Sequence, residues 1–498
     1  MHPQARALAS GLIRGPAPLM AFAVAQQEPP KRFTPIRQRP LDPAAPKAPL
    51  PDPSTRLTCQ RKRGLGRLIC SKDSTRPGCS RLNGPLAIPV APALTRTPSR
   101  SPDRSDTQQA SPAGQSLMPL PWGLWPAEAR LLLGLVAIWS LVGLLILTSA
   151  SWFVADREMG DAAYYLKRQA LWLLASWGLL LLAIRTSLRR WLHIAGTALV
   201  IASVLIAATL VIGSTVNGAS RWLVLGPIQI QPTELVKPFV VLQGAVLFSH
   251  WRRIGNDQKL LWLAIFGGVI LLILKQPNLS TAALLGLLLW LMALAGGLSL
   301  PLLIGAAGAG GLLGGASIMI NEYQRLRVTS FLNPWKDAQG DGYQLVQSLL
   351  AIGSGGILGE GLGLSTQKLQ YLPIQTTDFI FAVFAEEFGY VGSVMLLLFL
   401  LIFGFVGLRV ALSCRSNQHR LVAMGCTTLL VGQSILNIAV ASGAMPTTGL
   451  PLPMISYGGN SLLSSLFVCG LLIRCSLETT GLETARPRRR RQPPAPIG

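Results

Sequence analysis

Residues 131–153 read LLLGLVAIWSLVGLLILTSASWF and contain no charged side chain. An α-helix rises about 1.5 Å per residue, so about 20 apolar residues cross the hydrocarbon layer of a membrane, which is about 30 Å thick. The stretch therefore predicts a transmembrane helix. Further apolar runs lie at about 166–184, 191–213, 234–249, 260–274, 279–296, 298–320, 378–408, 421–445 and 454–474. Together they predict an all-α polytopic membrane protein with about ten transmembrane helices and a large external loop between the seventh and the eighth.

The composition of the chain excludes a water-soluble globular protein. Of its 498 residues, 50% are hydrophobic and 13% are charged, whereas soluble domains carry about 25% charged residues. The net charge of +23 is typical of nucleic-acid-binding proteins, but its distribution argues against that function. Residues 1–117 hold 18 Lys and Arg against 6 Asp and Glu. Much of the remaining excess lies in short turns between apolar runs, where it indicates membrane topology.

The same pattern divides the chain into three regions. Residues 1–117 are rich in Pro, Arg and Ser and have no apolar run long enough to form a core, so we expect a disordered basic tail. Alternatively, this tail is not translated in the natural protein, because Met118 shortly precedes the first hydrophobic run. Residues 118–475 are expected to form the ten-helix membrane domain, and residues 476–498 a basic cytoplasmic tail.

Basic residues in the turns predict the orientation in the membrane. With the N-terminus in the cytoplasm, every second turn is cytoplasmic and should be rich in Lys and Arg. The turns after the second, fourth and eighth runs have this character, and Asp257 is their only acidic residue. The segment 321–377 is balanced in charge, as expected for an external loop. Both termini are thus predicted to be cytoplasmic. The basic residues of these turns are Arg185, Arg189, Arg190, Arg252, Arg253, Lys259, Arg409, Arg415 and Arg420.

Ionisable residues gather on the predicted external side. Asp378 stands where the segment 321–377 enters the eighth apolar run, so it either caps that helix or acts as a catalytic base. Glu386 and Glu387 follow within the same run, at a depth where charged groups are costly and face a cavity or a partner. Glu234 and Lys237 are three residues apart, on one helix face, and are expected to form an ion pair.

Two further external stretches are rich in glycine and proline. The glycine cluster 353–363 allows the backbone to come close to a ligand or membrane surface, or to pack against helices. The stretch 445–461, which contains Ser456, interrupts the path between the ninth and tenth runs. Irregular backbone at membrane depth is tolerated only where it is buried in protein or lines a polar cavity. These stretches are therefore candidate parts of a binding site.

A series of motifs along residues 130–475 resembles that of the SEDS family of polytopic cell-wall enzymes. They are GASRWL at 218–223, QPTELVK at 231–237, QPNLST at 276–281, RVTSFLNPW at 327–335, GYQLVQS at 342–348, the glycine cluster leading into QKL at 367–369, YLP at 371–373, TDFIFA at 377–382, AEEFG at 385–389 and PTTGLPLPMISYGG at 446–459. The resemblance implies a fold like that of GT-C transferases. It also implies processive polymerisation of lipid II, an undecaprenyl-diphosphate-linked disaccharide pentapeptide, at the outer face of the bacterial inner membrane.

The resemblance also assigns roles to residues. The family's candidate catalytic acid precedes Phe-Ile-Phe and corresponds to Asp378, which would accept the proton of an attacking sugar hydroxyl. The external cations that can hold the diphosphate are Arg221, Lys368, Arg325 and Arg327, with a divalent cation (Mg²⁺ or Mn²⁺) as a further option. Supporting roles fall to Glu234, Lys237, Glu386, Glu387 and Ser456. The expected partners are lipid II, the growing glycan, a class B penicillin-binding protein and other proteins of the division machinery.

Some positions depart from the family pattern. Asn278 stands where many members have Asp, and Ile374 and Thr376 stand where many have Glu and His. These losses leave Asp378 as the candidate base. The GASRWL motif and the basic C-terminal tail favour the septal branch, FtsW, over the elongation branch, RodA. Two other functions remain as alternatives: a lipid II flippase, and a scaffold that only recruits the transpeptidase.

Overall fold

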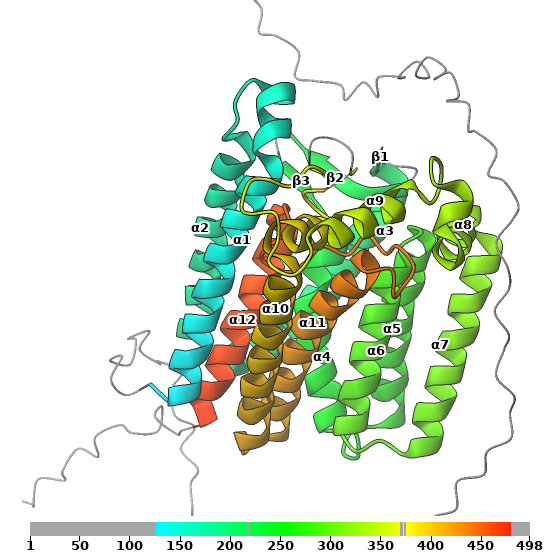
Figure 1. Ribbon diagram of the computed structural model, residues 1–498. Helices are drawn as coiled ribbons and strands as arrows, with labels where there is room; N and C mark the ends of the chain where they lie inside the picture. The colour runs from blue at the N-terminus through cyan, green and yellow to red at the C-terminus, as the bar shows by residue number, and fades with distance from the viewer. Residues whose placement is uncertain (1–124, 217–218, 227, 369–371, 373–374, 480–498) are drawn as a thin grey trace, which may run out of the picture. The chain divides into compact units, whose positions relative to one another are not determined.

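The computed structural model describes residues 125–479, apart from 217–218, 227, 369–371 and 373–374 (Figure 1). The predictions for residues 1–117, for a start at Met118 and for residues 480–498 lie outside this part of the chain. Within it, each of the ten apolar runs forms a helix. These are α1 (Ala127–Met159), α2 (Tyr164–Arg185), α3 (Leu188–Ile212), α4 (Pro232–Ser249), α5 (Asn256–Lys275), α6 (Leu279–Ala295), α7 (Leu300–Ile320), α10 (Ile380–Ser413), α11 (Asn417–Ala441) and α12 (Gly459–Thr479).

Eight of the described helices are long and apolar enough to cross a membrane. The remaining two of the ten are α6, which is apolar but short, and α4, whose first turns carry Glu234 and Lys237. The polytopic helical architecture predicted from the sequence is confirmed. Packing between helices relies on large buried side chains: Trp139 of α1 contacts Phe399 and Phe403 of α10 edge-on, with ring centroids 5.5 and 5.3 Å apart.

A small antiparallel sheet interrupts the helical pattern between α3 and α4. Its strands are β1 (Ser214–Val216), β2 (Ala219–Leu225) and β3 (Ile228–Ile230), in the order β1-β2-β3. In β2 and β3, Leu223 pairs with Ile230 and Leu225 with Ile228. Apolar runs do not predict this sheet, because strands this short lack the length that marks a transmembrane helix. Arg221 lies in the middle of β2, so the pairing of the strands restrains its backbone position.

The segment 321–377 contains three helical elements rather than one open loop. It contains α8 (Glu322–Leu332), the 3₁₀ turn η2 (Pro334–Asp337) and α9 (Tyr343–Ser354). Figure 1 shows α8, α9 and the three strands at one end of the membrane helices. Ser348 of α9 donates a hydrogen bond to the carbonyl of Ala441 at the end of α11, at 2.7 Å. The predicted external loop is therefore a cap that is anchored to the helices below it.

Helix α10 is broken at Gly389, whose φ of +64° is unfavourable for residues with a side chain. The glycine cluster fills the break. The carbonyls of Glu386 and Glu387 accept hydrogen bonds from the backbone N–H groups of Glu360 and Gly361, at 3.0 and 3.1 Å. A Cβ at Gly359 would overlap the carbonyl of Glu387. The sequence left open whether this cluster approaches a ligand or membrane surface or packs against helices. In the described residues it packs against α10.

Candidate active site

Asp378 lies in the turn that leads into α10. The N-cap of α10 is Phe379, and no side chain caps the helix, so the helix-cap interpretation of Asp378 is wrong. Its backbone carbonyl accepts a hydrogen bond of 2.8 Å from the Asn437 amide of α11, which also donates to the carbonyl of Leu450, at 2.7 Å. Among the described residues, no hydrogen bond or ion pair occupies the Asp378 carboxylate, and the residue is only partly buried. The carboxylate is thus available for a ligand.

Two arginines and Asp378 meet around Gly449. The Oδ2 atom of Asp378, the Nη1 atom of Arg327 and the Nη1 atom of Arg221 lie 3.6, 3.8 and 4.0 Å from the position that a Cβ on Gly449 would take. We call Arg221, Arg327 and Asp378 the charged cluster. They come from β2, α8 and the start of α10, which are far apart in the sequence. The fold therefore converges on the one carboxylate that the sequence singled out as a base.

Backbone carbonyls and one aromatic ring hold the arginines in place. Arg221 donates from Nε to the carbonyl of Gln276 at 3.1 Å and from Nη2 to the carbonyl of Pro277 at 2.7 Å. Arg327 donates from Nη1 to the carbonyl of Thr447 at 3.0 Å and lies over the ring of Tyr323, 4.5 Å from its centroid. Because these partners are mainly neutral, each guanidinium keeps its positive charge available to an anion.

Burial and charge act in opposite directions on Asp378. Burial raises the pKa of its carboxyl above the ordinary value, and the cations Arg327 and Arg221 partly offset this effect. Burial likewise lowers the pKa of Arg221, because removing a cation from water is unfavourable, and Tyr323 and Asp378 partly offset this effect. A carboxylate with a raised pKa accepts protons more readily. An anionic ligand would in turn stabilise the two arginines.

The stretch 445–461 closes over the turn that carries Asp378. Ser456 donates from its hydroxyl to the carbonyl of Thr377 at 2.5 Å and accepts from the N–H of Leu452 at 2.8 Å. The N–H of Tyr457 donates to the carbonyl of Thr376 at 2.8 Å. Ser456 thus positions the backbone next to Asp378. The supporting role predicted for Ser456 stays a prediction.

Glu234 and Lys237 form the expected ion pair, with 2.6 Å between Oε1 and Nζ, and both are buried. The ammonium also donates to the side-chain carbonyl of Gln433 in α11, at 2.8 Å. Gln433 in turn donates to the carbonyl of Pro451, at 2.8 Å. The pair therefore joins α4 and α11 to the stretch that covers Asp378, and its contacts are structural ones.

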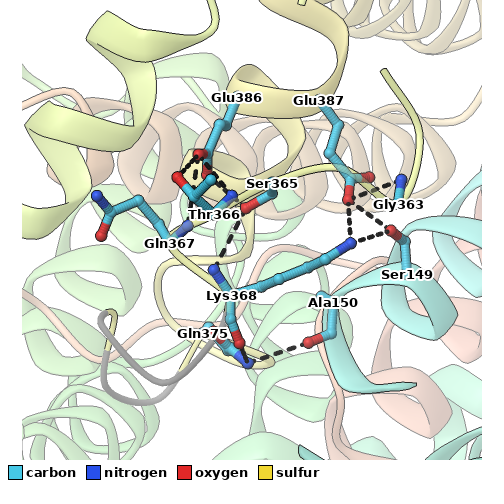
Figure 2. Close-up of polar contacts among 10 residues, drawn as sticks. All are labelled: Ser149, Ala150, Gly363, Ser365, Thr366, Gln367, Lys368, Gln375, Glu386 and Glu387. Atoms are coloured by element: carbon cyan, nitrogen blue, oxygen red, sulfur yellow. Dashed lines mark hydrogen bonds and ion pairs between the residues drawn. The ribbon is translucent and has the colours of Figure 1, made fainter. Parts of the chain in front are cut away.

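Lys368 lies in a second polar network rather than in the charged cluster (Figure 2). Its ammonium contacts Oε1 of Glu387 at 2.9 Å and the Ser149 hydroxyl at 3.4 Å, and only 8% of the side chain is exposed. The Glu387 carboxylate also accepts hydrogen bonds from Ser149, at 2.5 Å, and from the N–H of Gly363, at 3.1 Å. To bind a diphosphate, Lys368 would have to leave this pair.

Glu386 fixes the segment that carries Lys368. Its carboxylate accepts hydrogen bonds from the Ser365 hydroxyl and from the N–H of Thr366, the latter at 2.9 Å (Figure 2). Glu386 and Glu387 are buried and face protein partners, as expected for acidic groups within an apolar helix. Among the described residues, Arg325 contacts neither of these networks. More than half of its side chain is exposed, and its ion pair with Glu322 spans 3.8 Å.

Several residues that hold the site carried no signal in the sequence. Tyr323 contacts Arg327, and Asn437 contacts the backbone of Asp378. Gln433 contacts Lys237. The apolar periodicity of their helices does not predict these pairs. The buried amides Gln433 and Asn437 are themselves the only hint, because polar side chains inside a membrane helix usually have a partner.

The donor groups do not form a metal site of their own. Among the described residues, no three His, Cys, Asp or Glu side chains lie close enough together to hold an ion. Mg²⁺ and Mn²⁺ prefer oxygen ligands, and the charged cluster offers one carboxylate beside two cations. The predicted divalent cation therefore has a poor fit to these side chains, and we derive no step through it.

The chain is similar to curated cell-wall enzymes over most of its length. It is 51% identical over 360 residues to a probable peptidoglycan glycosyltransferase FtsW of Synechocystis, covering 72% of this chain and 92% of that protein. A putative peptidoglycan glycosyltransferase FtsW of Mesostigma viride is 46% identical, with 71% and 86% of the two chains covered. A probable peptidoglycan glycosyltransferase FtsW of Escherichia coli O6:H1 is 35% identical over 361 residues, or 70% and 86% of the two chains.

Solved structures resemble this fold as well. A structure described as the structural coordination of polymerization and crosslinking by a peptidoglycan synthase complex matches with a TM-score of 0.60 and 30% identity, over 72% of this chain and 99% of the other. The rod shape determining protein RodA of Thermus thermophilus matches with a TM-score of 0.53 and 29% identity, over 71% and 97% of the chains. The family model of the FtsW, RodA and SpoVE proteins, described as cell cycle protein, matches residues 129–481. Because this model matches most of the chain and the curated relatives are 35–51% identical to it, the chain belongs to the FtsW/RodA/SpoVE family.

Proposed function

We propose that the chain is a peptidoglycan glycosyltransferase that polymerises lipid II, with Asp378 as its general base. The curated relatives bear the name of this activity. The observation that carries the assignment to Asp378 is the convergence of one free carboxylate and two arginine cations within 4.0 Å of one point beside Gly449. This combination supplies both charges that the reaction needs.

The chemistry divides between the three side chains. The 4-hydroxyl oxygen of the incoming sugar attacks the anomeric carbon of the growing glycan, and the hydroxyl proton passes to the Asp378 carboxylate. The bond between the anomeric carbon and the diphosphate oxygen breaks, and its electron pair stays on the leaving diphosphate. Arg221 and Arg327 stabilise that developing negative charge. Attack from the face opposite the leaving group inverts the anomeric configuration.

We further propose that this reaction takes place at the outer face of the bacterial inner membrane, at the division septum. Support comes from the charge bias of the turns, which puts the Asp378 end of the helices outside and both termini in the cytoplasm. The proposed partners are a class B penicillin-binding protein, which would crosslink the product, and other division proteins. The similarity to a peptidoglycan synthase complex favours a crosslinking partner.

Polymerisation of purified lipid II, in the presence of the penicillin-binding partner, tests the role of Asp378. Asp378→Asn removes the proton acceptor but keeps the shape, so we expect the rate to fall by about 100- to 10,000-fold. Asp341→Asn is the matched control, because Asp341 is an exposed acid on the same cap. Glycan chains separated by gel electrophoresis give the rate.

The same experiment separates polymerisation from the two alternatives. Normal polymerisation by Asp378→Asn would remove Asp378 from catalysis. If the protein is a flippase or a scaffold, even the wild type should form no polymer. A scaffold also predicts that Asp378→Asn supports the growth of a depleted strain as well as the wild type does.

A further inference from the structure

A polar cavity lies at the opposite end of the helices from Asp378. Its volume is about 600 Å³, and it is formed where the α4–α5, α6–α7 and α10–α11 turns meet. Arg252, Arg253 and Arg415 line it, together with His250, Ser416 and the Gly296-Gly297 turn. Neither the proposed reaction nor its substrate site uses this cavity.

Three helices run from the charged cluster to this cavity and fix its place. Helix α6 begins after Gln276 and Pro277, whose carbonyls hold Arg221, and it ends beside Gly296. Helix α11 holds Asp378 through Asn437 near one end and begins at the cavity with Asn417. Helix α4 likewise runs from the buried Glu234 to Ser249 in the cavity wall. The two sites therefore lie at opposite ends of the helices.

The arginines of the cavity have no anionic partner within the described part of the chain. No hydrogen bond or ion pair joins the side chains of Arg252, Arg253 or Arg415 to any described residue, and all three residues are exposed. The nearby carboxylate of Glu478 is engaged by Arg474, at 2.7 Å, and by His419, at 3.5 Å. Topology alone requires basic residues in these turns, but it does not require them to share one cavity.

The start of α11 adds a second, independent attraction for anions. Its N-cap residue, Ser416, makes no side-chain hydrogen bond to the first turn, and Ser416, Asn417 and Gln418 all line the cavity. The free N–H groups and the positive end of the helix dipole favour a negative ligand at such a place. Asp257 of α5 is not among the residues that line the cavity.

We propose that this cavity binds a phosphate-bearing anion, namely the headgroup of an anionic phospholipid in the leaflet opposite to the Asp378 side. Arginine guanidinium groups match phosphate oxygens with paired hydrogen bonds. Basic pockets between membrane helices bind such headgroups. The neighbouring Trp251 ring, which carries the Lys259 ammonium 5.4 Å from its centroid, is the kind of side chain that lies at the membrane–water interface.

Native mass spectrometry of the purified full-length protein, with added phosphatidylglycerol or phosphatidylcholine, tests the proposal. We expect the wild type to retain phosphatidylglycerol in preference to phosphatidylcholine. The triple variant Arg252→Gln, Arg253→Gln, Arg415→Gln should bind phosphatidylglycerol about 100-fold more weakly, given the usual contribution of each arginine near a charged lipid. Replacing the same three residues by Lys keeps the charge but loses the paired geometry, and should give an intermediate affinity.

The matched control replaces three exposed arginines of the α2–α3 turn: Arg185→Gln, Arg189→Gln, Arg190→Gln. The backbone N–H of Leu188 and the side chain of His419 both contact Glu478, so this turn lies at the same end of the helices. Undiminished lipid binding by the cavity variant, or an equal loss in the control, would overturn the proposal. Equal melting temperatures show that both variants fold.

A titration with inorganic phosphate, in detergent without lipid, distinguishes a lipid headgroup from a free phosphate ion as the ligand. Binding of phosphate that is lost in the cavity variant would identify a free anion as sufficient. Binding of phosphatidylglycerol alone would identify the lipid headgroup. Neither result depends on polymerisation, so the outcome is independent of the proposed catalytic role of Asp378.

Discussion

Gly449 is the residue around which the candidate site is built. Its φ of +71° belongs to the region that glycine adopts readily, and it leaves open the space between Asp378 and the two arginines. Gly449→Ala would put a methyl group 3.6 to 4.0 Å from all three charged groups and strain the backbone by about 1–2 kcal/mol. We expect a large loss of polymerisation with a modest loss of stability.

Gly134→Ala serves as the control for that substitution. Gly134 lies in α1, where an added Cβ would meet no atom within 4 Å. Melting temperature in detergent and polymerisation rate are measured for both variants. If Gly449→Ala polymerises lipid II at the wild-type rate, the space between the charged groups does not hold the reacting atoms.

Arg327 should control the pH dependence of the reaction. A general base acts only when ionised, and the Arg327 cation lowers the pKa of Asp378 while burial raises it. Removing the cation raises this pKa further, so Asp378 becomes protonated, and activity is lost, at a higher pH than in the wild type. We expect Arg327→Gln to move the acidic limb of the kcat profile to higher pH. Activity of this variant should recover as the pH is raised.

Arg325→Gln is the matched control for the pH experiment. It removes the same charge from the same helix, but from an exposed side chain that contacts only Glu322 among its charged neighbours. Its pH profile should coincide with that of the wild type. Coincident profiles for Arg327→Gln and the wild type would show that Arg327 does not act on the ionised form of the base.

The sequence was informative about Asp378 and less so about the cations. The sequence left two interpretations of Asp378 open, a helix cap and a catalytic base; the family motif favours the base, and the structure excludes the cap. Of the four candidate cations, the sequence favoured Lys368 and Arg221. In the structure Arg221 and Arg327 lie in the charged cluster, Arg325 is exposed and Lys368 pairs with Glu387. Long-range pairings of this kind depend on the fold, so spacing along the chain cannot predict them.

At the scale of elements, the Lys368–Glu387 pair connects the cap to α10. Lys368→Met alone leaves the Glu387 carboxylate buried without its cation, which should lower stability by about 3–5 kcal/mol. The double variant Lys368→Met, Glu387→Gln removes both charges and should recover most of that loss. Because the Lys368 ammonium is engaged by Glu387 and Ser149, we expect polymerisation to recover together with stability.

The double variant also separates a structural role of Lys368 from binding of the diphosphate. Melting temperatures measure the contribution of the Lys368–Glu387 pair to stability, and the KM for lipid II measures substrate binding. A double variant that is stable, but has a much higher KM than the wild type, would assign Lys368 to the substrate site. Exposed Lys336→Met, on the same cap, controls for the loss of a positive charge.

Elements of different kinds were predictable to different degrees. The membrane-spanning helices follow from long apolar runs such as 131–153, because a hydrophobic layer of fixed thickness demands them. The strands β1–β3 and the helices α8 and α9 are short, and their stability comes from packing onto the ends of longer helices, which local sequence does not encode. The break in α10 at Gly389 also escaped prediction, since the glycine lies within a continuous apolar run.

At the scale of the whole molecule, the charge bias predicts which end of the helices faces the cytoplasm. A phosphatase that is active only outside the cytoplasm can be fused after Gly340, in the cap, or after Gly255, at the α4–α5 turn. We expect activity from the first fusion and none from the second. The reverse result would put Asp378 on the cytoplasmic side, where polymerisation of an external glycan is impossible.

The interruption of α10 has a mechanical consequence for the whole molecule. Both sides of the break are hydrogen-bonded to the glycine cluster of the cap. Before Gly389 the carbonyls of Glu386 and Glu387 accept from the cluster, and after it the N–H groups of Tyr390 and Val391 donate to the carbonyls of Gly356 and Ile357, at 2.9 and 3.1 Å. The cap therefore bridges the break, so a tilt of α10 in the membrane would carry the cap with it.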